Sequence, residues 1–183
     1  DAVQLRMISN VPLGAFLSGG LDSAAMVASM VRQQPQNGIR TYTIGFKERG
    51  YSETSEARVT ADFLGTIHNE KVVDAKLGNM FQEMVRVTGE PFADSSMIPF
   101  QHLSRFAREE ITVAISGDGC DELFAGYETY IADRIHHFLH FIPGLFSRAA
   151  LKLSQAVIPV TFDKVSFDYK LFRFLEGLNL SSS

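Results

Sequence analysis

The sequence predicts a doubly wound α/β domain, in which helices cover both faces of a parallel sheet. Three observations favour this fold class. Short apolar or β-branched runs alternate with longer segments of helical apolar periodicity. The connections between these segments are short, as they are in parallel α/β sheets. Two glycine-rich loops, moreover, each come directly after a predicted strand, which is where ligands bind in open α/β sheets.

Four segments are predicted as strands. The first is the apolar run 13–17, which leads into Ser18-Gly19-Gly20. Residues 40–46 form the second, because β-branched and aromatic side chains dominate them. The third is expected at 67–73, and the fourth at 111–115, where Ile-Thr-Val-Ala-Ile makes a buried run.

Helical patterns connect these strands. Residues 22–34 are apolar on most faces, as expected for a helix packed on a sheet, and Pro35 and Gly38 end the pattern. Ser52, followed by Ser55-Glu56, offers N-cap chemistry for the next helix. The remaining helices between the strands are predicted at residues 52–65, 75–88 and 97–109.

The pattern changes after about residue 133. Helical apolar stripes in residues 134–160 are broken at Pro143 and Pro159, and no further strand is evident. We therefore expect an α/β domain at 1–133 and a partial helical segment at 134–183, the start of the rest of a larger domain. Three histidines at helical spacing in this segment are better explained as surface or interface residues than as metal ligands, because no carboxylate or cysteine accompanies them: His136, His137 and His140.

Composition excludes several classes of protein. Apolar residues make up 45% and charged residues 21% of the chain, ordinary values for a globular protein. The net charge of −4 comes without a basic cluster, which argues against nucleic acid as a partner. No apolar run has the length of a transmembrane helix, which argues against membrane insertion. Cys120 is the only cysteine, so no intrachain disulfide forms. This fits a reducing compartment, and we expect a cytoplasmic protein.

The first glycine-rich loop, Ser18-Gly19-Gly20-Leu21-Asp22-Ser23, has the features of a pyrophosphate site. Its two glycines let a ligand approach the backbone N–H groups closely. The helix that follows presents unpaired N–H groups and a positive dipole end, and both favour an anion. Ser18 and Ser23 add hydroxyl donors. No lysine follows, so the loop is not a Walker A motif.

Asp22 is unexpected in such a loop, because a carboxylate repels a phosphate unless a cation lies between them. An oxygen-ligating Mg²⁺ would join Asp22 to the phosphates. The alternative is a structural turn in which Asp22 caps the helix. On the spacing alone, both interpretations stay open.

The second loop, residues 116–122, follows the last predicted strand and contains three carboxylates. Carboxylates this close together are unfavourable unless cations or basic groups offset them. Asp118 and Asp121 could complete a magnesium site with Asp22, or orient a nucleophile. A solvated acidic turn at the start of a helix is the alternative. Because both loops end strands of one sheet, a shared site is the stronger interpretation.

Five blocks of the sequence together resemble class B (glutamine-dependent) asparagine synthetases. They stand in the order in which that family has them and cover most of residues 10–130: Val11 to Ser23, Thr43 to Phe46, Leu64 to Glu70, Glu90 to Ser96 and Ser116 to Tyr127.

The resemblance implies a fold of the adenine nucleotide alpha hydrolase (PP-loop ATP pyrophosphatase) type, acting on ATP with Mg²⁺. Aspartate would be activated as β-aspartyl-AMP with release of pyrophosphate, and ammonia would then attack to give asparagine. The residues that would hold pyrophosphate with Mg²⁺ are Ser18, Gly19, Gly20, Asp22 and Ser23. Those that would line the adenosine pocket are Leu17, Ile44, Ser116 and Gly117. Asp118 would act beside the adenylate and the attacking ammonia, and Asp121 would assist as a catalytic or metal-binding residue.

Further partners follow from the same resemblance. A glutaminase domain is expected in the full-length protein, supplying ammonia from glutamine, and a homodimer is compatible with the sequence. Asp1 is not an initiator methionine, so we expect a fragment of a longer chain. Two alternatives remain. One is a related adenylating enzyme that acts on another carboxylate, and the other is a nucleotide-binding module without complete catalytic machinery.

Overall fold

The computed structural model of the chain describes residues 1–35, 38–47, 53–73, 77–90, 94, 96–139, 150–154 and 167–180. The chain folds into two compact units, Asp1–Asp118 and Gly119–Ser183. The boundary at residue 133 that the sequence analysis drew stays a prediction about domain organisation. No helix among the described residues is long and apolar enough to cross a membrane.

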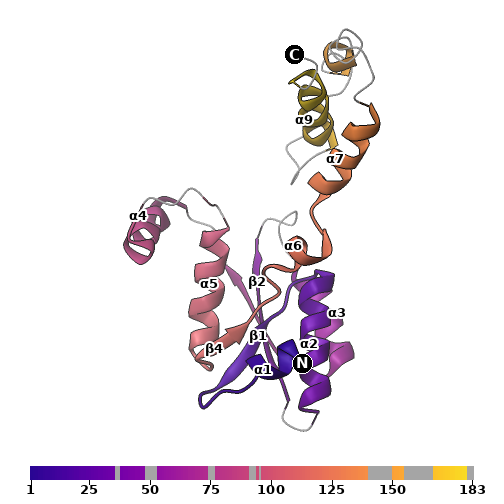
Figure 1. Cartoon of the computed structure of the whole chain (residues 1–183). Coiled ribbons are helices and arrows are strands. Elements are labelled where there is room, and N and C mark those ends of the chain that lie inside the picture. The colour runs from indigo at the N-terminus through magenta and orange to yellow at the C-terminus, as the bar shows by residue number, and fades with distance from the viewer. Residues whose placement is uncertain are drawn as a thin grey trace. The chain divides into compact units, whose positions relative to one another are not determined.

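The first unit contains a four-stranded sheet in the order β3-β2-β1-β4, and every neighbouring pair is parallel (Figure 1). The strands are β1 (Leu13–Phe16), β2 (Arg40–Phe46), β3 (Ile67–Val73) and β4 (Val113–Ile115). In register, Ala15 of β1 lies opposite Thr41 on one side and Ile115 on the other. All four predicted strands are thus confirmed, β1 one residue shorter than predicted.

The fourth strand begins two residues later than predicted. Ile111 still belongs to the turn that follows the preceding helix, since its N–H donates to the Ala107 carbonyl at 2.9 Å. The Thr112 N–H then donates to the Pro12 carbonyl at 2.8 Å, and regular pairing starts at Val113. The apolar character of Ile111 reflects burial under the sheet, at 3% exposure, and not strand geometry.

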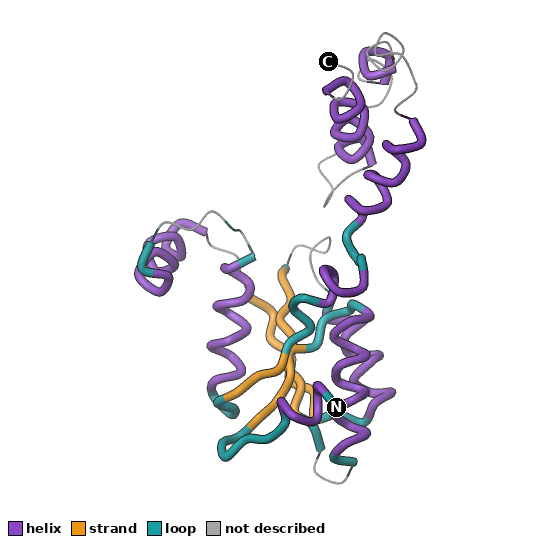
Figure 2. The backbone as a smooth tube through the Cα atoms, viewed as in Figure 1, coloured by secondary structure: helices purple, strands orange, loops and turns teal. Residues whose placement is uncertain are grey.

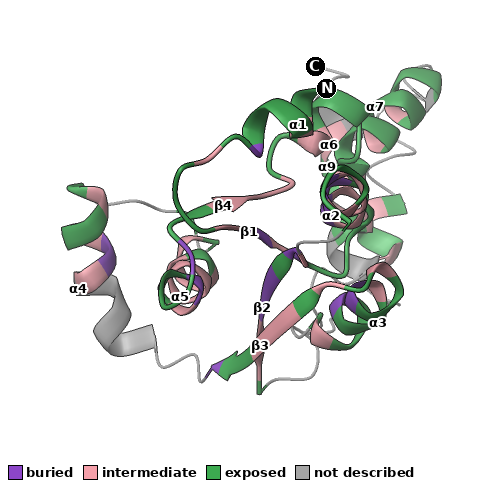
Figure 3. Ribbon diagram, turned by 90° about the horizontal axis from the view of Figure 1, so that it is seen from below, coloured by how far each residue is buried: buried purple, intermediate pink, exposed green. Residues whose placement is uncertain are grey.

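Helices cover both faces of this sheet, which confirms the doubly wound arrangement (Figure 3). One face carries α2 (Leu21–Gln33) and α3 (Thr54–Leu64), and the other carries α5 (Met97–Arg108). The helix α4 (Leu77–Thr88) contacts α5. A short helix at the N-terminus, α1 (Ala2–Arg6), contacts α2 and was not expected from the sequence.

The hydrophobic core is divided between the two faces. Under α2 and α3, Val27 and Met30 pack against Ala15 of β1, and all three are fully buried. Under α5, Tyr42 is fully buried and its ring meets that of Phe106 edge-on at 5.6 Å. Burying a large aromatic or aliphatic side chain contributes about 1.5–3 kcal/mol, so both faces of the sheet are anchored.

The ends of α3 show how local sequence sets the helix bounds. Gly65 ends it with a left-handed conformation, φ +67°, that glycine adopts at little cost. Its N-cap is Glu53, which makes no side-chain capping hydrogen bond. The predicted cap, Ser52, lies outside the described residues, and the Ser55 hydroxyl bonds to the Glu56 carboxylate at 2.7 Å.

The second unit is helical in its described part, as the sequence predicted for the C-terminal segment. It contains α6 (Cys120–Phe124), α7 (Glu128–Leu139) and α9 (Phe167–Leu180). An ion pair between Lys170 and Glu128 joins α9 to α7. His136 and His137 lie in the last turn of α7, whereas His140, Pro143 and Pro159 lie outside the described residues.

Candidate functional site

The strand order creates a switch point at the middle of the sheet. From β1 the chain goes on to β2 and β3 on one side and then returns to β4 on the other. The loops that follow β1 and β4 therefore leave neighbouring strands at the same, carboxyl edge of the sheet (Figure 2). Ligands of open α/β sheets bind at such a point. These are the two loops that the sequence analysis singled out.

The two loops touch through a glycine of the second. A Cβ on Gly117 would lie 3.1 Å from the backbone nitrogen of Ser23 and 3.4 Å from the carbonyl carbon of Asp22. Because these are backbone atoms of the first turn of α2, a side chain at 117 would push the loops apart. Glycine at this position thus brings Gly117 against Asp22 and Ser23, as the sequence analysis expected of the two motifs.

The first loop is held in shape from below by a serine. Ser23 is buried, at 7% exposure, and its hydroxyl lies 2.9 Å from the Ser18 hydroxyl. The Ser18 N–H donates to Ser23 Oγ at 3.2 Å, and Ser23 Oγ lies 3.1 Å from the Gly20 carbonyl oxygen. In this arrangement Ser23 positions the loop, while Ser18, Gly19 and Gly20 are exposed.

The start of α2 leaves an anion-binding end available. Its N-cap is Gly20, with φ −80° and ψ 154°, and no side chain caps the helix. Asp22 lies inside the first turn and is therefore not the N-cap of α2. The unpaired N–H groups and the positive dipole end of α2 face the same loop.

A carboxylate directly before α3 also contacts this loop. The Gly19 N–H donates to Glu53 Oε2 at 3.4 Å, a long hydrogen bond between residues 34 positions apart. A Cβ on Gly19 would lie 2.8 Å from the Cβ of Glu56, so the start of α3 packs directly on the loop. Nothing in the local sequence pattern of residues 53–56 indicated this contact, because it depends on how α3 packs.

The residues expected to line an adenosine pocket lie on different faces of the sheet. The Leu17 side chain is 2% exposed and packs with α2 and α3, so only its backbone can take part in a binding site. Ile44 is half-buried, and strand alternation puts it on the face of Tyr42, under α5. Ser116 and Gly117 are half-buried at the end of β4.

The acidic residues of the second loop are divided between the two units. Asp118 ends the first unit, is exposed, and accepts a hydrogen bond from the Ser116 hydroxyl at 2.7 Å. Asp121 lies in the first turn of α6 in the second unit, with its carboxylate against the backbone of Gly126. Among the described residues, no three histidine, cysteine, aspartate or glutamate side chains are grouped closely enough to hold a metal ion by themselves.

A buried polar network lies near the amino ends of β2 and β3, and it was not predicted. His68 Nδ1 lies 2.9 Å from the Thr41 hydroxyl, and His68 Nε2 lies 3.1 Å from Glu70 Oε1, at ion-pair distance but without hydrogen-bond geometry. Burial lowers the pKa of His68, and the nearby Glu70 carboxylate opposes this shift. Since Thr41 and His68 stand near the start of their strands, we assign the network to structure.

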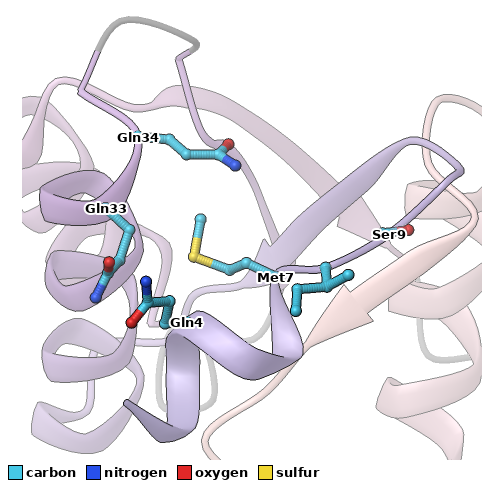
Figure 4. A pocket seen from close by; sticks show the side chains of 6 residues that line it. Gln4, Met7, Ser9, Gln33 and Gln34 are labelled. Carbon is cyan, nitrogen blue, oxygen red and sulfur yellow. The ribbon is translucent and has the colours of Figure 1, made fainter.

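A hollow between α1 and the end of α2 is separate from the candidate site (Figure 4). Its volume is about 400 Å³, and its lining consists of Gln4, Met7, Ile8, Ser9, Gln33 and Gln34. The helix α2 starts at the carboxyl end of β1, so its last residues lie toward the amino ends of the strands. None of the predicted site residues lines this hollow.

Comparison with known proteins gives the family. The sequence model of the asparagine synthase family matches residues 1–167. The chain belongs to the asparagine synthase family. Asparagine synthetase [glutamine-hydrolyzing] 1 of Bacillus subtilis is 38% identical over 131 residues, which cover 71% of this chain and 20% of that protein. The resemblance drawn from the five sequence blocks is thereby confirmed.

Other relatives of the chain carry different names. Amidase chyE of Penicillium rubens is 34% identical over 160 residues, covering 79% of this chain and 24% of that protein. The chain thus spans about a quarter or less of the length of these two relatives. Among solved structures, the NH3-dependent NAD synthetase of Campylobacter jejuni covers 98% of this chain and 89% of its own, with 14% identity and a TM-score of 0.44.

Proposed function

We propose that this chain is the ATP-using, amide-forming part of an asparagine synthetase. ATP activates the side-chain carboxylate of aspartate as β-aspartyl-AMP and releases pyrophosphate. Ammonia then attacks the acyl-adenylate to give asparagine and AMP. The observation that carries this proposal is the contact of Gly117 with the start of α2 at the switch point of the sheet, in a chain of this family.

Pyrophosphate binds, in this proposal, to the exposed first loop. Gly19 and Gly20 offer backbone N–H groups, Ser18 offers a hydroxyl, and the start of α2 adds its dipole. Ser23 is buried beneath the loop and holds its shape, so we propose a positioning role for it. Donors fixed in advance stabilise developing charge without reorganisation at the moment of reaction.

The carboxylates of the two loops are of the type that binds magnesium. Mg²⁺ is usually held by one or two protein carboxylates together with substrate phosphates and water. Asp22 provides a half-buried carboxylate in the first turn of α2, beside the loop. Among the described residues, no three ligand side chains are grouped together. A magnesium site does not need such a group when phosphate oxygens supply the other ligands. We propose Asp22 and Asp121 as the ligands, and the bound ion would neutralise phosphate charge.

Asp118 is proposed to act beside the adenylate and the incoming ammonia. Its exposed carboxylate is oriented by the Ser116 hydroxyl at 2.7 Å. Ammonia that arrives as ammonium must lose a proton before it attacks, and an oriented carboxylate can accept that proton. The adenosine pocket is proposed to consist of the Leu17 backbone with Ile44, Ser116 and Gly117. In the full-length protein, glutamine hydrolysed by a glutaminase domain supplies the ammonia.

A second candidate function keeps the adenylation step but changes the carboxylate. It is favoured by the 34% identity to a relative named as an amidase, close to the 38% identity to an asparagine synthetase. Both reactions need the same loops for ATP. They differ in the pocket for the acceptor carboxylate.

Exchange of radiolabel between pyrophosphate and ATP tests the proposal on the full chain. Exchange that requires aspartate is the expected result. Exchange that requires another carboxylate would replace aspartate by that substrate and support the second candidate. If ATP binds but no carboxylate supports exchange, the chain is a nucleotide-binding module and the proposed reaction is wrong.

Asp22→Ala should abolish the magnesium-dependent part of this activity. Losing a metal ligand at a phosphate site removes several kcal/mol, so exchange should fall by roughly 100-fold or more. Asp62→Ala is the matched control, because Asp62 is an exposed aspartate near the far end of α3. Equal exchange rates for the two variants would contradict the assignment of Asp22.

A further inference from the structure

The contact between Glu53 and the first loop has no role in the function proposed so far. Glu53 stands directly before α3, and its Oε2 accepts the Gly19 N–H at 3.4 Å. The contact is supported by close packing, since a Cβ on Gly19 would lie 3.5 Å from the Glu53 Cβ and 2.8 Å from that of Glu56. The Glu53 carboxylate is therefore held beside the loop by the fold of the chain.

The Gly19 N–H is a donor that a phosphate oxygen would use. A carboxylate oxygen resembles a phosphate oxygen, because both are anionic acceptors of charge-assisted hydrogen bonds. The neighbouring donor is engaged in a similar way, as the Gly20 N–H donates to the Ser18 hydroxyl at 3.2 Å. Each of the two glycine N–H groups thus points at an oxygen of the chain itself, and one of these oxygens is charged.

One N–H cannot serve two anions well. A phosphate that approaches Gly19 has to displace the Glu53 carboxylate, and the two negative charges repel each other at short range. Glu53 is exposed, so solvent screens this repulsion and keeps its effect moderate. Its direction is nonetheless fixed: the carboxylate weakens the binding of an anion at this donor.

We propose that Glu53 is an affinity-determining residue of the pyrophosphate loop, a carboxylate that competes with phosphate for the Gly19 N–H. This inference rests on the proposed function, since it assumes that the loop binds pyrophosphate. Binding of phosphate exchanges one anionic acceptor for another and moves the Glu53 side chain away. Glu53 thereby favours anions whose charge a cation has already reduced over bare anions.

Glu53→Gln tests this competition, because the amide keeps the shape and one acceptor oxygen but removes the charge. The probe is inorganic pyrophosphate without added metal, and affinity is measured by isothermal titration calorimetry on the full chain. We expect Glu53→Gln to bind pyrophosphate about 3- to 10-fold more tightly than the unmodified protein, the range for losing one screened repulsion at short distance.

Glu56→Gln is the matched control. Glu56 lies in the first turn of α3, close to Glu53, but its carboxylate accepts the Ser55 hydroxyl at 2.7 Å and not the loop N–H. Glu56→Gln should change the affinity for pyrophosphate by less than about twofold. The stem of the Glu56 side chain packs on Gly19, but its carboxylate is exposed and largely screened. An amide NMR spectrum gives a second readout: the Gly19 signal should shift in Glu53→Gln and stay in place in Glu56→Gln.

The outcomes separate this inference from the function on which it rests. Tighter binding by Glu53→Gln alone supports the competition. If both variants bind pyrophosphate more tightly by the same factor, the cause is the lower negative charge of the protein as a whole, and the inference is wrong. If the unmodified protein binds pyrophosphate and Glu53→Gln binds equally or more weakly, the inference is wrong but the proposed function stands. If no protein binds pyrophosphate or its magnesium complex, the proposed function fails as well.

Discussion

Gly117→Ala tests whether the close contact of the two loops builds the site. The added Cβ would lie 3.1 Å from the Ser23 nitrogen and 3.4 Å from the Ser23 Cα, both backbone atoms. No side-chain rotation can relieve this contact, so the second loop has to move away from α2. Overpacking costs about 1–3 kcal/mol in a closed core. Because residues 116–118 lie at the edge of the sheet and can shift, we expect the lower end, about 1 kcal/mol.

The loss of binding should exceed this loss of stability. A displaced second loop moves Ser116 and Asp118 away from the pyrophosphate loop, and a misplacement of about 1 Å can cost roughly 100-fold in rate. We expect ATP affinity to fall about tenfold and exchange activity further, as measured by calorimetry and by ATP–pyrophosphate exchange.

The matched control for this substitution is Gly177→Ala, in α9, where an added Cβ meets nothing within 4 Å. Alanine there should leave activity unchanged and stabilise the helix by up to about 1 kcal/mol. Urea unfolding measures the stability of both variants. Unchanged ATP binding by Gly117→Ala would refute the argument that this glycine sets the distance between the loops.

Two further predictions concern Ser23, beneath the first loop, and His68, in the polar network near the start of β2 and β3. Ser23→Ala removes the hydroxyl that holds the first loop. Urea unfolding should show that the free energy of unfolding falls by about 1 kcal/mol, and calorimetry should show a several-fold weaker affinity for ATP. Unchanged affinity would contradict the positioning role of Ser23. Burial lowers the pKa of His68, so the folded protein binds a proton there less readily than the unfolded chain. Stability should therefore fall as the pH drops below about 6.5. His68→Asn should make the unfolding free energy less dependent on pH between about 7 and 5, and equal slopes would contradict this sign.

The strands could be predicted because their composition and their burial agree. Residues 40–46 are β-branched and aromatic and form the second strand of a sheet covered on both faces. The exceptions arose where packing overrides composition. Ile111 is apolar because it is buried in the turn after α5, and the five-residue α1 is too short for a periodic signal.

The candidate site was predictable in its loops and not in its contacts. Glycines and acidic residues directly after strands predicted Ser18–Ser23 and residues 116–122, because parallel strands place their carboxyl ends at one edge. The contact of Glu53 with Gly19 spans 34 positions and depends on the docking of α3, which no local pattern reveals. The same holds for the network of Thr41, His68 and Glu70, whose members come from two strands.

Gly19 and Gly117 act through the missing side chain and not through an unusual backbone. Among the described glycines, those with positive φ are 38, 65, 89 and 119, and none of them is Gly19 or Gly117. An added Cβ would instead collide with the start of α3 at Gly19 and with the start of α2 at Gly117. Two helix starts can therefore pack onto the loops from the sides, while Gly19 and Gly20 themselves stay exposed. A loop fixed in this way loses little conformational entropy when an anion binds, which is the condition for tight binding by a few hydrogen bonds.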